Sequence, residues 1–207
     1  MIRRSAWEFS LKACIAFLTV ALAASPCLAD WKASEETSFY SVSGTRPSDI
    51  YQSIGQRGPE IGKAKKRVIA HTRYVLRWDR KFDRSNGTCT IVSATPRLKI
   101  TYTLPKPAQK LPPAVQKSWD IFIDGIRRHE LVHGDHAKEM TQDIVRETVG
   151  LSIPNDPDCR KMKQELIRII ESHVDRQRIR GRDFDRAEMG PGGPIERLVL
   201  EFLNSAR

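Results

Sequence analysis

Three of the five histidines in the chain lie within eight residues, at His129, His133 and His136. The first two frame the sequence HELVH. Residues four apart lie on one face of a helix, so both imidazoles can bind a single metal ion. Glu130 would stand beside that ion, where its carboxylate can take a proton from a metal-bound water. The pattern therefore predicts a zinc site in which Glu130 is the general base for hydrolysis of an amide.

A solvated helix face is the competing interpretation of the same residues. The histidines and Glu130 would then only pair with Arg127, Arg128 or Asp135. We favour metal binding because histidine is scarce in this chain and because apolar residues flank the motif, as a helix that carries a buried metal requires. These flanking residues are Ile121, Phe122, Ile126, Leu131 and Val132.

A catalytic zinc normally takes three protein ligands and keeps a fourth position for water. His136 is the nearest candidate for the third ligand, because it lies three residues after His133 and roughly on the same face. A straight helix places it about 10 Å along the axis from His129. We predict His136 as the third ligand, because this choice needs no long-range assumption.

Carboxylates from the next predicted helix remain open alternatives for the third ligand. If two long helices form an antiparallel hairpin that turns near Pro154, His133 lies opposite the neighbourhood of Asp175, and Glu171 lies opposite His136. Asp185 follows the second helix and is a further candidate. Ion pairing with neighbouring arginines is the competing interpretation of Glu171 and Asp175.

Alternating hydrophobicity predicts the strands that must support this helix. Residues 68–82 and 89–104 form two long alternating runs, joined by the turn signal Ser85-Asn86-Gly87. A shorter run at 37–43 predicts a first strand, and residues 47–54 predict a short helix. Pro96, within the second long run, indicates a bulge or an edge position.

Helical periodicity dominates the second half of the chain. A long helix at 114–149 carries HELVH, and Gly134 within it indicates a kink or a close packing contact. A second long helix is expected at 158–180, ended by Gly181, and a short amphipathic helix at 195–204. The predicted fold class is α+β, with an antiparallel sheet followed by the long HELVH helix, an antiparallel partner helix and a short C-terminal helix.

The first 29 residues have the pattern of a secretory signal peptide. A basic start is followed by an apolar run at 13–24 and by small residues that end at Ala29. We therefore predict a single periplasmic or secreted domain at 30–207, strand-rich over 30–110 and helical over 111–207. Its two remaining cysteines, Cys89 and Cys159, are expected to form one disulfide in an oxidising compartment.

The formal net charge of +10 is best explained as ordinary solvated surface charge and does not identify a partner. A basic exported protein can be attracted peripherally to an anionic envelope surface. The charge is spread along the chain and no nucleic-acid-binding motif occurs, so we predict no nucleic-acid partner.

The chain resembles a bacterial family of unknown function whose members are labelled predicted secreted zinc-dependent proteases. The resemblance is carried by YSVSG at 40–44, by Gly58-Pro59, by the strand from Thr72 to Trp78 with the Cys89 strand after it, and by the HELVH helix preceded by Trp119 and followed by Cys159. It implies a zincin-like domain that cleaves peptides.

In members of that family, the shared region ends with a Tyr-Asp-x-x-Thr-x-His-Gly segment. Here residues 184–191 keep only the aromatic residue, Phe184, and the aspartate, Asp185. If the family's closing histidine is a metal ligand, the resemblance implies that another residue replaces it in this chain, and His136 is the natural substitute.

The leading functional hypothesis is a zinc peptidase whose peptide or protein substrate lies along an exposed strand edge beside the helix. Two alternatives remain open. The histidine cluster could serve only structure in a non-catalytic envelope-binding module, or the same metal chemistry could hydrolyse amide cross-links of the cell wall.

Overall fold

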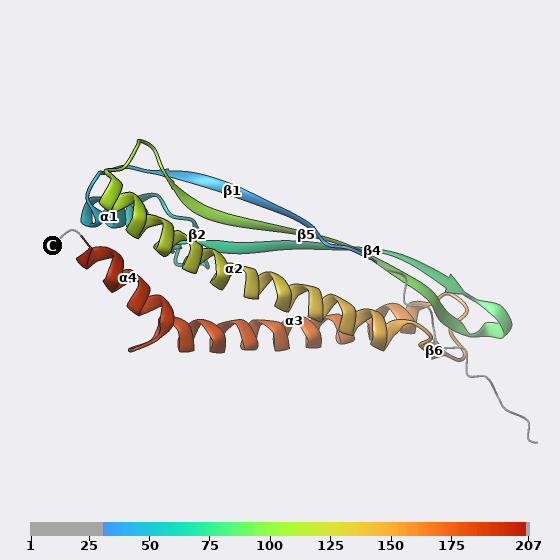
Figure 1. Cartoon of the computed structure of the whole chain (residues 1–207). Helices are drawn as coiled ribbons and strands as arrows, with labels where there is room; N and C mark the ends of the chain where they lie inside the picture. The colour runs from blue at the N-terminus through green and yellow to red at the C-terminus, as the bar shows by residue number, and fades with distance from the viewer. Residues whose placement is uncertain (1–30, 206–207) are drawn as a thin grey trace, which may run out of the picture. The chain divides into compact units, whose positions relative to one another are not determined.

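In the computed structural model, which describes residues 31–205, two long neighbouring strands form most of the sheet (Figure 1). β4 (His71–Asp83) and β5 (Cys89–Pro107) run antiparallel, and a turn at Ser85–Gly87 joins them. Asn86 in this turn has a φ of 56°, a left-handed conformation that asparagine adopts more readily than most residues. The predicted hairpin is confirmed. The signal-peptide prediction for 1–29 lies outside the described residues.

The sheet is mixed, which corrects the prediction of an antiparallel sheet. β1 (Ser34–Val42) pairs with β5 in parallel, so the strand order is β1-β5-β4. Between β1 and β4 the chain passes through α1 (Pro47–Arg57) and a small hairpin of β2 (Glu60–Ile61) and β3 (Lys66–Arg67). The chain between β1 and its parallel neighbour β5 therefore includes α1, this hairpin and the whole of β4, which meets the need of parallel neighbours for a long connection. Period-two alternation does not encode strand direction.

Pro96 lies at a local edge of β5. On one side it pairs with Trp78 of β4. On the other side β1 pairs with β5 only from Lys99 onward, and β6 (Ser152–Ile153) pairs only with the first two residues of β5. No described strand therefore lies beside this side of Pro96, where a residue without an N–H is tolerated.

Helix α2 (Pro113–Thr148) lies between the sheet and α3 (Arg160–Met189), which runs back beside α2 in the opposite direction (Figure 1). The short α4 (Pro194–Asn204) packs near the start of α2. The described residues thus form a mixed sheet covered by α2, with α3 outside it, and the α+β class is confirmed. No helix within residues 31–205 is long and apolar enough to cross a membrane.

Helix α3 continues through Gly181 to Met189, whereas the sequence predicted that it ends at Gly181. An interior glycine costs about 1 kcal/mol relative to alanine, which a helix packed along its length can absorb. Gly181 is buried, and a Cβ built on it would lie 3.7 Å from Nδ1 of His133. The glycine therefore marks the contact between α3 and α2, and the added turns carry Asp185.

The register of the α2–α3 hairpin also differs from the prediction. Three pairs of side chains define it: His133 with Asp185, Glu139 with Arg180, and Glu147 with His173. These pairs are centred near Cys159 and not near Pro154, because β6 and the loop before Cys159 lengthen the connection. Glu171 and Asp175 consequently lie on exposed positions of α3 and do not face the HELVH histidines.

The connection between the two helices is fixed by a disulfide and by a helix cap. Cys89 of β5 is bonded to Cys159, with a Cα–Cα distance of 5.3 Å, which confirms the predicted pairing. The Asp156 carboxylate accepts hydrogen bonds from the backbone N–H groups of Lys161 (3.1 Å) and Met162 (2.9 Å). These contacts hold the beginning of α3 against β5.

Two glycines of α2 permit close packing. A Cβ on Gly134 would lie 2.1 Å from Oη of Tyr102 on β5, and one on Gly125 would lie 2.4 Å from Cδ2 of Leu198 on α4. Neither glycine interrupts α2. Of the two possibilities predicted for Gly134, the structure shows a packing contact.

Candidate metal centre

Two histidines of α2 and one aspartate of α3 converge in space. His129 and His133 lie one helical turn apart, and their Nε2 atoms are 3.3 Å from each other. Oδ1 of Asp185 lies 2.8 Å from Nε2 of His133 and 3.3 Å from Nε2 of His129. Three potential ligand atoms from two helices therefore form one small triangle.

The size of this triangle fits a small metal ion. Tetrahedral zinc with ligand bonds of about 2.0–2.1 Å keeps its ligand atoms roughly 3.3 Å apart. The observed separations are 3.3, 3.3 and 2.8 Å. His129 is buried, whereas 43% of the Asp185 side chain is exposed, so the group is open to solvent on the α3 side.

The two histidines stabilise the negatively charged form of Asp185. Partial burial by itself raises the pKa of Asp185, but hydrogen bonds with His129 and His133 more than offset this and hold the pKa well below its usual range. Burial lowers the pKa of His133, while the hydrogen bond with Asp185 and its charge outweigh burial, and the pKa is raised. The carboxylate is therefore ionised, as a metal ligand must be.

His136 is not brought into this group. It lies on the same helix, with its ring centroid 6.1 Å from that of His133. Its side chain lines a separate hollow with Met140 and His173. Burial, and then the charge of Arg180, lower its pKa. The third residue of the converging group is Asp185, the last of the predicted alternatives, and not His136.

Glu130 is held next to this group by a strand. Its carboxylate is buried and accepts a hydrogen bond from the Thr72 hydroxyl at 2.6 Å. Thr72 is the second residue of β4, and its hydroxyl also lies 3.0 Å from the Glu130 carbonyl oxygen. This contact fixes the orientation of Glu130 relative to the sheet.

Phe184 packs against the two histidines. Its ring stacks on that of His129 at a centroid distance of 4.8 Å and an interplanar angle of 18°. It meets the ring of His133 edge-on, at 5.4 Å. Nδ1 of His129 is buried without a hydrogen-bond partner, and the nearest carboxylate oxygen, on Glu188, is 3.9 Å away.

Sequence reasoning assigned no role to Thr72 or Glu188. Phe184 had a signal, because it is the aromatic residue kept from the family's closing segment. His71, beside Thr72, lies near enough to this region for the charges of Glu130 and His133 to affect its pKa, which burial chiefly lowers. His71 is not among the three converging ligand residues.

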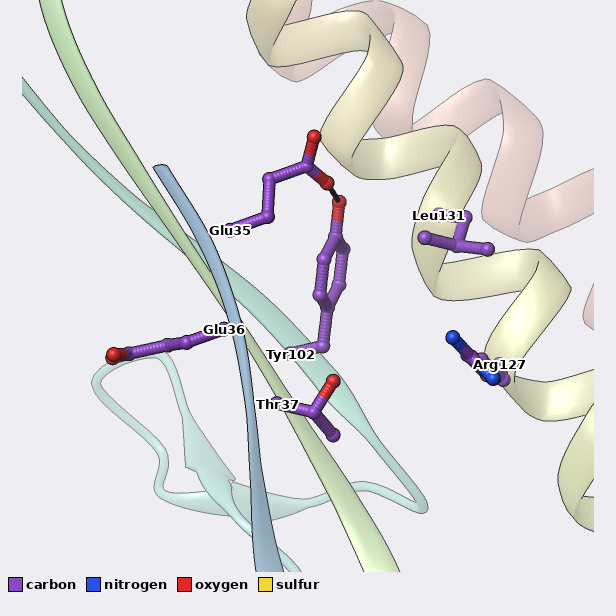
Figure 2. Close-up of a pocket in the computed structure, with 6 residues that line it drawn as sticks. All are labelled: Glu35, Glu36, Thr37, Tyr102, Arg127 and Leu131. Carbon is purple, nitrogen blue, oxygen red and sulfur yellow. Dashed lines mark hydrogen bonds between the residues drawn. The ribbon is translucent and has the colours of Figure 1, made fainter. Parts of the chain in front are cut away.

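A hollow on another side of α2 is separate from this group. It lies between β1 and α2, and Figure 2 shows Tyr102 pointing from β5 toward Glu35. The Tyr102 hydroxyl donates to Glu35 at 2.5 Å, and burial and then this hydrogen bond raise the pKa of Tyr102. Arg127 and Leu131 form the opposite wall (Figure 2). None of the described residues that line this hollow is a histidine.

The fold and the site together define an α+β domain in which two antiparallel helices carry a His-His-Asp group able to hold a metal ion. The family model described as "Bacterial protein of unknown function (DUF922)" matches residues 37–193, well over half of the chain. The chain belongs to this family, and the match includes all three residues of the group. The expected membership of a bacterial family of unknown function is confirmed. Searches of curated proteins and of solved structures gave no match.

Proposed function

We propose that this protein is a zinc-dependent peptidase that acts in the periplasm or outside the cell. The peptidase activity in this proposal is supported by one observation, the convergence of His129, His133 and Asp185 beside the buried carboxylate of Glu130. Two nitrogen donors and one oxygen donor form a ligand set that zinc accepts, and three protein ligands leave a position for water.

Each residue has a distinct role in this proposal. The two histidines and Asp185 would hold the zinc. The chemistry supplied by a zinc ion at this position would be a lowered pKa of its bound water and polarisation of the scissile carbonyl. Glu130 takes the proton from the attacking water and passes it to the amine that leaves, as general base and then general acid. Thr72 keeps the Glu130 carboxylate in position through its 2.6 Å hydrogen bond.

The free edge of β4 is the proposed binding surface for the substrate backbone. β4 pairs with β5 along one side, and no described strand pairs with its other side. An extended peptide can add to such an edge through backbone hydrogen bonds. Because Thr72 belongs to β4 and contacts Glu130, a peptide on this edge passes close to the proposed base.

Export is supported by the N-terminal sequence and by the cysteines. The basic start and apolar run of the first 29 residues are typical of a cleaved signal peptide. The Cys89–Cys159 disulfide is of a kind that forms in oxidising compartments. The basic surface would add a peripheral attraction to anionic envelope polymers.

Metal analysis of the purified protein, combined with casein cleavage, tests the proposal. We expect one zinc per chain, which Glu130→Gln retains while it lowers cleavage by about 10²- to 10⁴-fold, the usual contribution of a general base. Asp185→Asn should lose both zinc and cleavage. Glu171→Gln is the matched control, because Glu171 is an exposed carboxylate of α3 outside the group.

The results can contradict the proposal in two ways. A protein without zinc after reconstitution, or cleavage that Glu130→Gln leaves unchanged, would exclude this mechanism. Zinc that is retained without cleavage of any peptide would instead favour the non-catalytic envelope-binding module.

A further inference from the structure

A cavity of about 250 Å³ opens beside Glu130. His129 and Glu130 form part of its wall, so it adjoins the proposed catalytic residues directly. The other walls come from α1, from the segment 66–70 that leads into β4, from α2, and from the ends of α3 and α4. One face of α2 therefore carries the proposed base and also forms part of the cavity wall.

Away from these two residues the lining is mainly aliphatic. Its apolar wall includes Ile54, Val68, Ile69, Ile126, Met189 and Ile195. Two basic residues, Lys66 and Arg67, also line the cavity. The Arg67 guanidinium is already paired with Glu60 at 2.6 Å and donates to the Gly58 carbonyl at 2.9 Å, and Lys66 is exposed to solvent. A charged side chain placed against the aliphatic part of this wall would lose its water, which costs several kcal/mol, whereas an apolar side chain gains from being buried there.

We infer that this cavity is a specificity subsite that receives a large apolar side chain of the peptide, next to the scissile bond. This inference rests on the proposed peptidase function and adds the class of substrate. Volume supports it, because a protein cavity of about 150 Å³ already holds a benzene molecule. The cavity therefore accommodates a leucine or phenylalanine side chain, and an alanine would leave most of it unfilled.

The position of the cavity relative to β4 also supports a subsite for a peptide side chain. Val68 to Ala70 lie immediately before the first residue of β4 and line the cavity. A peptide on the free edge of β4 directs alternate side chains to the same side. One of them can then enter the cavity while the neighbouring peptide bond lies near Glu130.

Gly55 allows the subsite to be narrowed without disturbing the core. It lies at the cavity on α1, and a Cβ built on it meets no described atom within 4 Å apart from those of its own turn of helix. Its φ is not in the left-handed region, so a side chain can be added there without backbone strain. Gly55→Trp places a large ring at the cavity, and Gly55→Ala is the matched control that adds only a methyl group.

A peptide library that varies the residues around the cleaved bond tests the subsite. We expect the zinc-loaded wild type to prefer leucine or phenylalanine over alanine at one position by roughly 10- to 200-fold. Gly55→Trp should lower this ratio by about tenfold, and Gly55→Ala should leave it within about twofold, if discrimination follows the space for the side chain.

A binding measurement tests the cavity independently of peptidase activity. Isoleucine δ1-methyl resonances of the purified protein are followed during titration with toluene. Those of Ile54, Ile69, Ile126 and Ile195 should shift, whereas that of Ile144, which does not line the cavity, should not. Gly55→Trp should weaken this response.

Each outcome decides a different point. Absence of shifts at the four methyls overturns the subsite, whatever the enzyme cleaves. Shifts with cleavage that shows no side-chain preference overturn its role in specificity. Shifts without cleavage of any peptide show that the proposed function fails while the cavity exists, and the inference fails with that function.

Discussion

The hydroxyl of Thr72 on β4 lies 2.6 Å from the carboxylate of Glu130 on α2. This contact joins the sheet to the helix at the residue proposed to be the general base. A hydroxyl has a single proton to donate, and the competing acceptor, the carbonyl oxygen of Glu130, is at 3.0 Å. The shorter distance indicates that the carboxylate is the main acceptor, so Thr72 positions the base.

Replacing Thr72 with valine should reduce turnover. A hydrogen bond to a charged group is worth about 1.5–3 kcal/mol, so we expect kcat to fall by roughly 10- to 100-fold with little change in KM. Thr72→Ser keeps the hydroxyl and should retain most of the activity. A change in KM alone, or an equal loss of kcat in both variants, would indicate that Thr72 contributes only packing.

Gly134 and Tyr102 provide a test of helix–sheet packing. A Cβ at position 134 would lie 2.1 Å from the Tyr102 hydroxyl, so Gly134→Ala should lower the free energy of unfolding by about 1–3 kcal/mol. Tyr102→Phe removes the hydroxyl, and the double variant should be less destabilised than the sum of the two single variants. Urea denaturation of all three measures this coupling, and strict additivity would show that the two residues do not compete for space.

The HELVH site could be predicted because its spacing is local. His129, Glu130 and His133 lie within a single helix, whose geometry fixes their relative positions whatever surrounds them. His136 shares that helix, but the rise along its axis keeps it away from the convergence point of the other two histidines. The sequence therefore predicted on which face of the helix each histidine lies, but not whether His136 could approach the same point as His129 and His133.

Asp185 could not be chosen from the sequence, because its position depends on the connection between two helices. The prediction placed the turn at Pro154 and did not include β6 or the loop before Cys159. These residues shift the register of the helical hairpin by more than one helical turn. Gly181 also looked like a helix end, although tertiary packing keeps α3 continuous there. The parallel direction of β1 was missed for a similar reason, since it depends on a long-range pairing with β5 that strand periodicity does not encode.

The Cys89–Cys159 disulfide should stabilise the fold without determining metal binding. It closes a loop with a sequence separation of 70 residues, and such a disulfide typically contributes about 2–5 kcal/mol. The double variant Cys89→Ala/Cys159→Ala should lose that much free energy of unfolding. Asp185 lies roughly 37 Å further along α3, so the folded variant should bind zinc as the wild type does. Calorimetry and metal analysis check the two statements, and a folded double variant without zinc would contradict the second.

Asp156 should make stability depend on pH through the cap of α3. Burial by itself raises the pKa of Asp156, but the backbone N–H groups of Met162, Lys161 and Arg160 outweigh it, and the folded-state pKa is lowered. A lowered pKa means that the contribution to stability is complete above the unfolded-state value of about 3.9 and is lost as pH falls through the folded-state pKa. Asp156→Asn cannot titrate, so it should be less stable than the wild type at pH 7, with a difference that narrows below about pH 4.

Urea denaturation from pH 7 to pH 2.5 measures this difference directly. Asp158→Asn is the matched control, because Asp158 is an exposed neighbour whose carboxylate accepts no backbone hydrogen bond among the described residues. We expect its stability curve to run parallel to that of the wild type. A difference between Asp156→Asn and the wild type that stays constant with pH would mean that the charge of Asp156 does not contribute to the cap. The aspartate would then act through the shape of its side chain alone.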